Sequence, residues 1–126
     1  MDGEKITKGL TLLCTVANGQ YCGGTFRCAP RAKNDDGLME VCLIRGISLL
    51  SFLIILPKFI KGEHLDNRFC MKRMVYRQAR KVELSCKDLM HVSLDGEIIA
   101  SDHFDMEIID KAVTLRLPGL KKEDVQ

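Results

Sequence analysis

Apolar residues recur in short, alternating runs along most of this chain, a pattern typical of half-buried β-strands. Residues 9–17 place leucine, cysteine and valine around Thr11 and Thr15 and predict the first strand. Similar runs predict further strands over residues 26–28, 38–44, 75–86, 91–94, 98–99, 104–109 and 112–117. Glycine-containing turn signals at residues 18–19, 23–24, 34–37 and 95–97 separate several of these runs.

One segment departs from this alternation. Residues 47–56 are apolar at all but two positions, and the spacing predicts a helix that begins after Ser48 as its N-cap. Pro57 is expected to break or kink this helix and to open a second helical turn that ends at Gly62. The run is too short to cross a membrane, which needs ~20 apolar residues. We expect either a buried helix or one that leans on a lipid surface.

Together these elements predict a mostly β domain. Its expected architecture is a β-sandwich or partial barrel of short, mainly antiparallel strands, with one inserted helical hairpin. The 126 residues suffice for one domain with a core, here residues 1–118. Residues 119–126 are charged and are predicted to be a disordered tail.

Composition narrows the function classes. A formal net charge of +2, aromatic content of 6% and no tryptophan argue against nucleic-acid binding. The six cysteines lack the paired spacing of a zinc site, and the first five residues are polar, unlike a signal peptide. We therefore interpret the cysteines as reduced core thiols of a cytoplasmic protein, peripheral at most to the inner membrane face.

Four stretches, in order, resemble a known family. The first is the run from Ala17 to Gly24, which is followed by Ala29-Pro30. The other three are residues 35–41, 61–64 and 94–97. Their order and spacing are similar to the C-terminal domain of bacterial diacylglycerol kinase and sphingosine kinase-like lipid kinases. The resemblance implies phosphoryl transfer from ATP to a lipid hydroxyl, such as that of diacylglycerol.

Two departures from the family pattern are informative. Thr25 stands where family members usually have a third glycine. The phosphate-binding Gly-Gly-Asp-Gly motif of the family's first domain occurs nowhere in the chain. Residues 1–4 resemble the turn after the second domain's opening strand, so that strand is expected to be missing, as in a truncated or split gene or an expressed fragment. The chain alone is therefore predicted to be inactive.

The resemblance assigns catalysis to the Asp-Gly-Glu turn. Glu97 corresponds to the general base, with Asp95 beside it in the site. Two carboxylates on a tight turn suit that role, because crowding raises one pKa towards working pH. The alternative is a common hairpin turn with Glu97 facing solvent, and the same tripeptide recurs at Asp2 to Glu4.

The resemblance also implies binding of Mg²⁺ and ATP. Asn18, Gly23 and Gly24 lie in the loop expected to approach the co-substrate ATP. The Asp36 carboxylate, with the carbonyls of Lys33 and Leu38, corresponds to a magnesium site, and magnesium takes few protein ligands. The alternative is an Asx-type turn closed by Asp35 or Asp36.

Three further features leave both a functional and a structural interpretation open. The basic stretch could face ATP phosphates or anionic lipids, but a solvated strand face is favoured; its residues are Arg68, Lys72, Arg73, Arg77, Arg80 and Lys81. His64 is interpreted as a hydrogen-bonded structural histidine. The apolar helix is expected to pack in the core, although an exposed part could border the acyl chain or sit on a bilayer.

The sequence thus predicts the lipid-binding, base-carrying domain of a lipid kinase that meets its lipid substrate at a membrane surface. The alternatives are a non-catalytic lipid-binding or protein-interaction module and one chain of a split kinase with a separate nucleotide-binding chain. A homodimer through the unpaired strand edge is also expected if a second copy supplies the missing strand. The lipid itself stays open.

Overall fold

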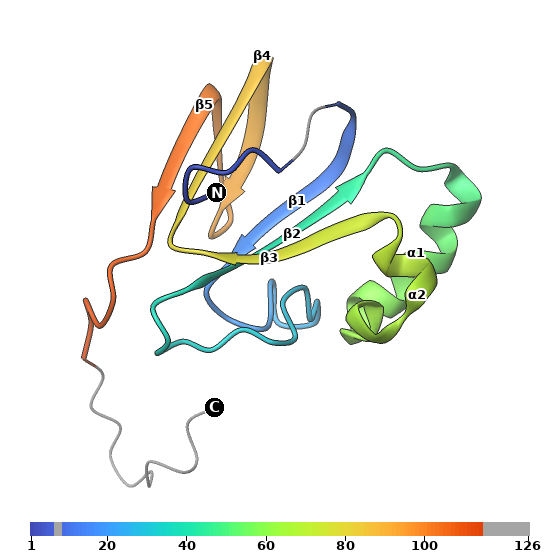
Figure 1. The fold of residues 1–126 in the computed structure, drawn as a ribbon, viewed down its shortest axis with the longest axis horizontal. Helices are drawn as coiled ribbons and strands as arrows, with labels where there is room; N and C mark the ends of the chain where they lie inside the picture. The colour runs from blue at the N-terminus through green and yellow to red at the C-terminus, as the bar shows by residue number, and fades with distance from the viewer. Residues whose placement is uncertain (7–8, 115–126) are drawn as a thin grey trace, which may run out of the picture.

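A computed structural model describes residues 1–6 and 9–114 of the chain. Five strands and three short helical segments make up this part of the protein (Figure 1). They are β1 (Thr11–Ala17), β2 (Met39–Arg45), α1 (Leu49–Lys61), the 3₁₀ helix η1 (His64–Asp66), α2 (Arg68–Met71), β3 (Met74–Ala79), β4 (Lys81–Leu94) and β5 (Glu97–Glu107). The prediction of a mostly β, antiparallel fold with an inserted helical part is confirmed.

The strands form two antiparallel sheets, β1-β2-β3 and the β4-β5 hairpin. β2 is central in the first sheet, and every one of its residues except the last is buried. A strand covered on both faces needs apolar residues at successive positions, and β2 has them at every buried position except Glu40. β1 and β3 are the edges of this sheet.

The helices and the loop between β1 and β2 cover one face of the three-stranded sheet. Ile55 and Phe59 of α1 are buried there with Cys42 and Ile44 of β2. Cys28, Ala29 and Ala32 of the loop and Cys70 of α2 complete this cluster. The predicted packing of α1 in the core is therefore right for one side of the helix.

The other face packs against the base of the hairpin. Val82 of β4 is fully buried together with Met39, Val41 and Ala79. Register slips between Ser85 and Met90, and the hairpin bends over at this level (Figure 1). A bulge of this kind is a usual way for a long hairpin to change direction.

Several predicted element boundaries are wrong. Residues 26–28 form no strand: Phe26 pairs only with Cys22 across a small turn, and the Arg27 N–H donates to the Ile60 carbonyl. Residues 75–86 are two strands that meet at Arg80, and residues 98–109 form one strand to Glu107 rather than two. The short helical segments after Gly62 were not predicted. Residues 112–114 are not a strand, and the rest of that prediction and the proposed tail lie outside the described residues.

Pro57 neither breaks nor ends α1, which runs continuously from Leu49 to Lys61. Proline leaves the carbonyl four residues earlier, that of Leu53, without its helical donor. Both residues are exposed, so water can bond that carbonyl, and Ile55 and Phe59 anchor the helix on either side. Ser48 is the N-cap as predicted, and Gly62 ends the helix with φ 76°.

The cysteines do not all belong to the core. Cys28, Cys42 and Cys70 are buried, Cys14 is half-buried, and Cys22 and Cys86 are exposed. Burial raises the pKa of the Cys42 thiol to about 12. No helix among the described residues is long and apolar enough to cross a bilayer.

Candidate functional site

The glycine-containing loop after β1 is held by one polar side chain. The Gln20 amide donates to the Ala32 carbonyl at 3.3 Å, and its oxygen accepts from the Arg27 guanidinium at 2.9 Å. Gly23 and Gly24 have φ of 61° and 80°, and no atom lies within 4 Å of a Cβ built on either. Both glycines are exposed, so this turn offers its backbone to an open side of the protein.

Asp36 closes the next loop as an Asx turn. Its Oδ1 accepts a hydrogen bond from the Leu38 N–H at 3.0 Å, which is the structural alternative foreseen for this residue. The buried Gly37, with φ 68°, lies against Asp110, whose Cγ is 3.3 Å from the position of an added Cβ. Asn34 of the same loop reaches within 3.5 Å of the corresponding position at Gly19. The loop therefore contacts both the turn after β1 and the segment after β5.

This loop has the donor set that magnesium uses. The second oxygen of Asp36 and the carbonyls of Lys33 and Leu38 accept no hydrogen bond from a described residue outside the strand ladders. Among the described residues, no three acidic, cysteine or histidine side chains gather closely enough to hold a metal. Mg²⁺ does not need such a cluster, because one or two carboxylates with waters suffice. The loop thus supplies oxygens of the type that magnesium binds, from one carboxylate and two carbonyls.

The Asp-Gly-Glu turn forms the tip of the long hairpin. Asp95 (φ 48°) and Gly96 (φ 100°) connect Leu94 and Glu97, which pair as the last residues of the ladder. This is the two-residue hairpin turn that Asp-Gly favours. Both carboxylates are exposed, and no hydrogen bond or ion pair between described residues links them to the Asp36 loop. The hairpin turn was predicted correctly. Its geometry fits both interpretations of Glu97, as a general base and as a solvent-facing residue of an ordinary turn.

The basic stretch does not form one strand face. Arg73 stacks on Phe69 with 3.7 Å between the guanidinium carbon and the ring centroid, and it donates to the Phe69 carbonyl. Lys81 pairs with Asp105 at 3.0 Å. These two members have structural partners, and the six residues are spread over α2, β3, β4 and the turns between them.

His64 is fully buried, as a structural histidine should be, but it is not hydrogen-bonded. Neither ring nitrogen has a hydrogen-bond partner among the described residues, and the ring centroid lies 4.7 Å from that of Phe59. Burial lowers the pKa of His64, although the nearby Lys58 carbonyl and Asp66 oppose that shift. The side chain is therefore a neutral core residue in the folded protein.

Glu40 is a buried acid that the sequence analysis did not single out. Its side chain is 2% exposed; Oε1 accepts from the Gln78 amide at 2.8 Å, and Oε2 has no partner. Burial first, and then the Glu40 charge, raise the pKa of the Tyr76 hydroxyl, for which the described residues offer no hydrogen-bond partner. These residues line a hollow of about 240 Å³ with Arg31 and Arg77. The signal was a lone charged residue inside the apolar run of β2.

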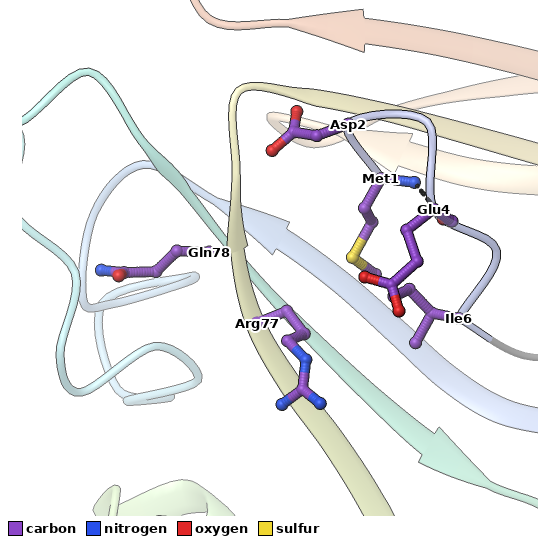
Figure 2. A pocket seen from close by; sticks show the side chains of 6 residues that line it. All are labelled: Met1, Asp2, Glu4, Ile6, Arg77 and Gln78. Atoms are coloured by element: carbon purple, nitrogen blue, oxygen red, sulfur yellow. Dashed lines mark hydrogen bonds between the residues drawn. The ribbon is translucent and has the colours of Figure 1, made fainter.

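A second hollow of about 100 Å³ lies where the N-terminal segment passes β3 (Figure 2). Figure 2 shows Met1, Glu4 and Ile6 on that segment, near Arg77 of β3. The Asp2 carboxylate accepts from the Lys81 and Arg80 N–H groups at 2.8 and 3.1 Å, which lowers the pKa of Asp2. The first Asp-Gly-Glu, residues 2–4, therefore has a structural role, since Asp2 holds the connection between β3 and β4. None of the predicted site residues lines either hollow.

Comparison with known proteins identifies the family. Residues 1–117 match the family model described as the YegS C-terminal NAD kinase beta sandwich-like domain. A probable YegS-like lipid kinase from Pectobacterium atrosepticum is 31% identical over 110 residues, 87% of this chain and 34% of that protein. A diacylglycerol kinase from Bacillus subtilis is 25% identical over 93 residues, 74% of this chain and 29% of that protein.

The chain spans about a third of the length of these relatives. A third, the YegS-like probable lipid kinase of Shewanella frigidimarina, is 28% identical over 82% of the chain and 32% of its own length. The matched region contains both sheets, the helices and the Asp-Gly-Glu hairpin. The chain therefore belongs to the YegS- and diacylglycerol kinase-like lipid kinases, as their C-terminal β-sandwich-like domain.

Proposed function

We propose that this chain is the lipid-binding, base-carrying domain of an ATP-dependent lipid kinase. The observation that carries the proposal is the exposed Asp-Gly-Glu turn, placed at the tip of a long hairpin within a domain of a lipid kinase family. A carboxylate at such a tip can reach a hydroxyl on a separate molecule.

In the proposed reaction Glu97 accepts the proton of the lipid hydroxyl while the hydroxyl oxygen forms a bond to the γ-phosphorus of ATP. The bond between that phosphorus and the bridging oxygen breaks, and ADP leaves with the electron pair. Asp95, on the other side of Gly96, adds a second exposed carboxylate at the hairpin tip. The products are a lipid phosphate and ADP.

Magnesium, when bound, neutralises charge near the transferring phosphate. The residues that would hold it are Asp36, through its carboxylate, and Lys33 and Leu38, through their carbonyls. The open turn at Gly23 and Gly24, which follows Asn18, is the part of this chain best suited to approach the nucleotide. The sequence has no Gly-Gly-Asp-Gly motif for the ATP phosphates, so a nucleotide-binding part is needed for activity.

The test measures transfer of labelled phosphate from ATP to lipid, by the chain alone and with the nucleotide-binding part of a YegS-like kinase added. Activity should appear only in the mixture. Glu97→Gln should lower it by at least about a hundredfold, within the range expected for loss of a general base. The chain supplies its own matched control, because Glu4→Gln alters the structural Asp-Gly-Glu and should leave activity unchanged.

Activity that survives in Glu97→Gln would remove Glu97 from the base role. Activity of the chain alone would show that no separate nucleotide-binding part is required. No transfer in a mixture whose two parts associate would favour the alternative, a non-catalytic lipid-binding or interaction module.

A further inference from the structure

One side of α1 is apolar and is left exposed by the part of the chain that the structure describes. Leu49, Leu50, Leu53 and Ile54 are 72%, 74%, 55% and 51% exposed. At 100° per residue these four positions, with the exposed Pro57, fall within one side of the helix. The opposite side carries the buried Ile55 and Phe59, so the helix is apolar on both sides while only one is covered.

The start of β1 extends this apolar surface. Leu10 is 84% exposed and Leu12 48% exposed. Leu10 accepts a backbone hydrogen bond from Gly46, three residues before α1 begins, and its side chain lies over that glycine. Figure 1 shows the start of β1, the end of β2 and α1 at the same end of the three-stranded sheet. We call Leu10, Leu12, Leu49, Leu50, Leu53 and Ile54 the apolar end.

The segments that carry the apolar end have charges of one sign. Residues 10–13 and 45–61 contain Arg45, Lys58 and Lys61 and no acidic residue. Lys58 and Lys61 lie in the last turn of α1 and have no ion-pair partner among the described residues. Leucines beside lysines on one helix are the combination that lies in the headgroup region of an anionic bilayer.

From this we infer that the apolar end is the surface by which the protein docks on an anionic lipid bilayer, with α1 lying in the membrane interface. The inference deepens the proposed function and rests on it only for the expectation that the lipid substrate is met at a membrane. α1 has 13 residues and cannot span a bilayer, but a helix of this length can lie in its surface.

A second copy of the chain is the less suitable occupant. A stable protein interface uses roughly 20–30 residues on each side. The apolar end offers only six large apolar side chains. A bilayer requires no matching surface and accommodates both the leucines and the lysines.

The test is co-sedimentation of the 126-residue chain with vesicles of phosphatidylcholine, with and without phosphatidylglycerol. Binding is expected with the anionic vesicles. Leu50→Gln/Leu53→Gln should weaken it by at least about tenfold, since burial of leucine drives insertion and glutamine keeps helix propensity. The matched control is Leu89→Gln/Ile98→Gln, which changes residues 67% and 74% exposed on the hairpin and should bind normally.

Charge is tested separately. Neutralising Lys58 and Lys61 with glutamine should weaken binding to anionic vesicles by about fivefold per lysine and leave the weak binding to neutral vesicles unchanged. The chain has no tryptophan, so a single Leu53→Trp reports on depth. Its emission should shift to the blue with vesicles and be quenched by brominated lipid, whereas Leu89→Trp should do neither.

Equal loss in the two double variants, or binding unaffected by Leu50→Gln/Leu53→Gln, would overturn the inference. The inference would also be overturned if the chain sedimented as a dimer and Leu50→Gln/Leu53→Gln converted it to a monomer, because a second copy would then occupy the surface. The vesicle assay contains no ATP. If the kinase assay fails but vesicle binding depends on the apolar end, only the proposed function is refuted. If the protein is active on detergent-dispersed lipid but vesicle binding does not depend on the apolar end, only this inference is refuted.

Discussion

Two adjacent isoleucines of α1 test whether the helix is held to the sheet by one side only. Ile55 is 1% exposed and packs against the sheet, while its neighbour Ile54, which points about 100° away round the helix, is 51% exposed. Replacing each with alanine removes the same atoms from the same helix. Differences in helix propensity therefore cancel between the two variants, and only the surroundings of the side chain differ.

The expected free-energy changes follow from burial. Ile55→Ala removes buried methyl groups and leaves a cavity, which costs about 2–5 kcal/mol. Ile54→Ala removes atoms that already contact water, so we expect a change within about 0.5 kcal/mol. The difference is large compared with the roughly 5–15 kcal/mol that stabilises a typical domain.

Urea unfolding followed by circular dichroism measures both effects. With a typical slope of about 2 kcal/mol per molar urea, Ile55→Ala should lower the midpoint by roughly 1–2.5 M at unchanged slope. Ile54→Ala should unfold with the parent protein. Equal destabilisation of the two variants would contradict the description of α1 as packed on one side, and with it the exposed surface inferred for membrane docking.

Three further changes probe local features. Gly62→Ala should cost at least about 1–2 kcal/mol in the free energy of unfolding, since Gly62 has φ 76° and an added Cβ would lie 2.7 Å from Arg27 Cδ. The lowered pKa of His64 means that the unfolded chain takes up a proton that the folded protein does not. Stability should therefore fall as pH drops below about 6.5, by up to about 1.4 kcal/mol per pH unit; His64→Leu should remove that component and His91→Leu should retain it. Tyr76→Phe removes a buried hydroxyl without a partner, so its unfolding midpoint should match the parent or exceed it.

Local signals predicted the parts of the fold that local interactions determine. The apolar residues around Thr11 and Thr15, the strand-forming residues of β2, the Ser48 cap and the Asp95-Gly96 turn each depend on neighbouring residues, and all four elements were predicted. Each is a feature whose hydrogen bonds or burial pattern can be read within a few positions.

The wrong predictions involve contacts between distant segments. Phe26 and Arg27 have strand-like side chains, but their N–H groups bond Cys22 and Ile60, so no ladder forms. Pro57 stays helical because the residues around it are anchored on the sheet, which outweighs one lost hydrogen bond. The division at Arg80 depends on Asp2, which bonds the backbone of residues 80 and 81 from the other end of the chain.

The candidate site was predicted less completely than the fold. The turn that carries Glu97 and the loop that carries Asp36 were found because short motifs resemble those of the family. The buried Glu40 was missed, since whether a lone acid in a strand faces solvent or the core depends on which sheet edge and which loop lie beside it. No local pattern gives that information.

The most direct measurement of the central claim is lipid phosphorylation by a chimera in which this chain replaces the C-terminal domain of a YegS-like lipid kinase. The account predicts ATP-dependent formation of lipid phosphate by the chimera, a loss of at least about a hundredfold on Glu97→Gln, and full activity on Glu4→Gln. A folded chimera that binds ATP but transfers no phosphate, or one in which Glu97→Gln is as active as the parent, would contradict it.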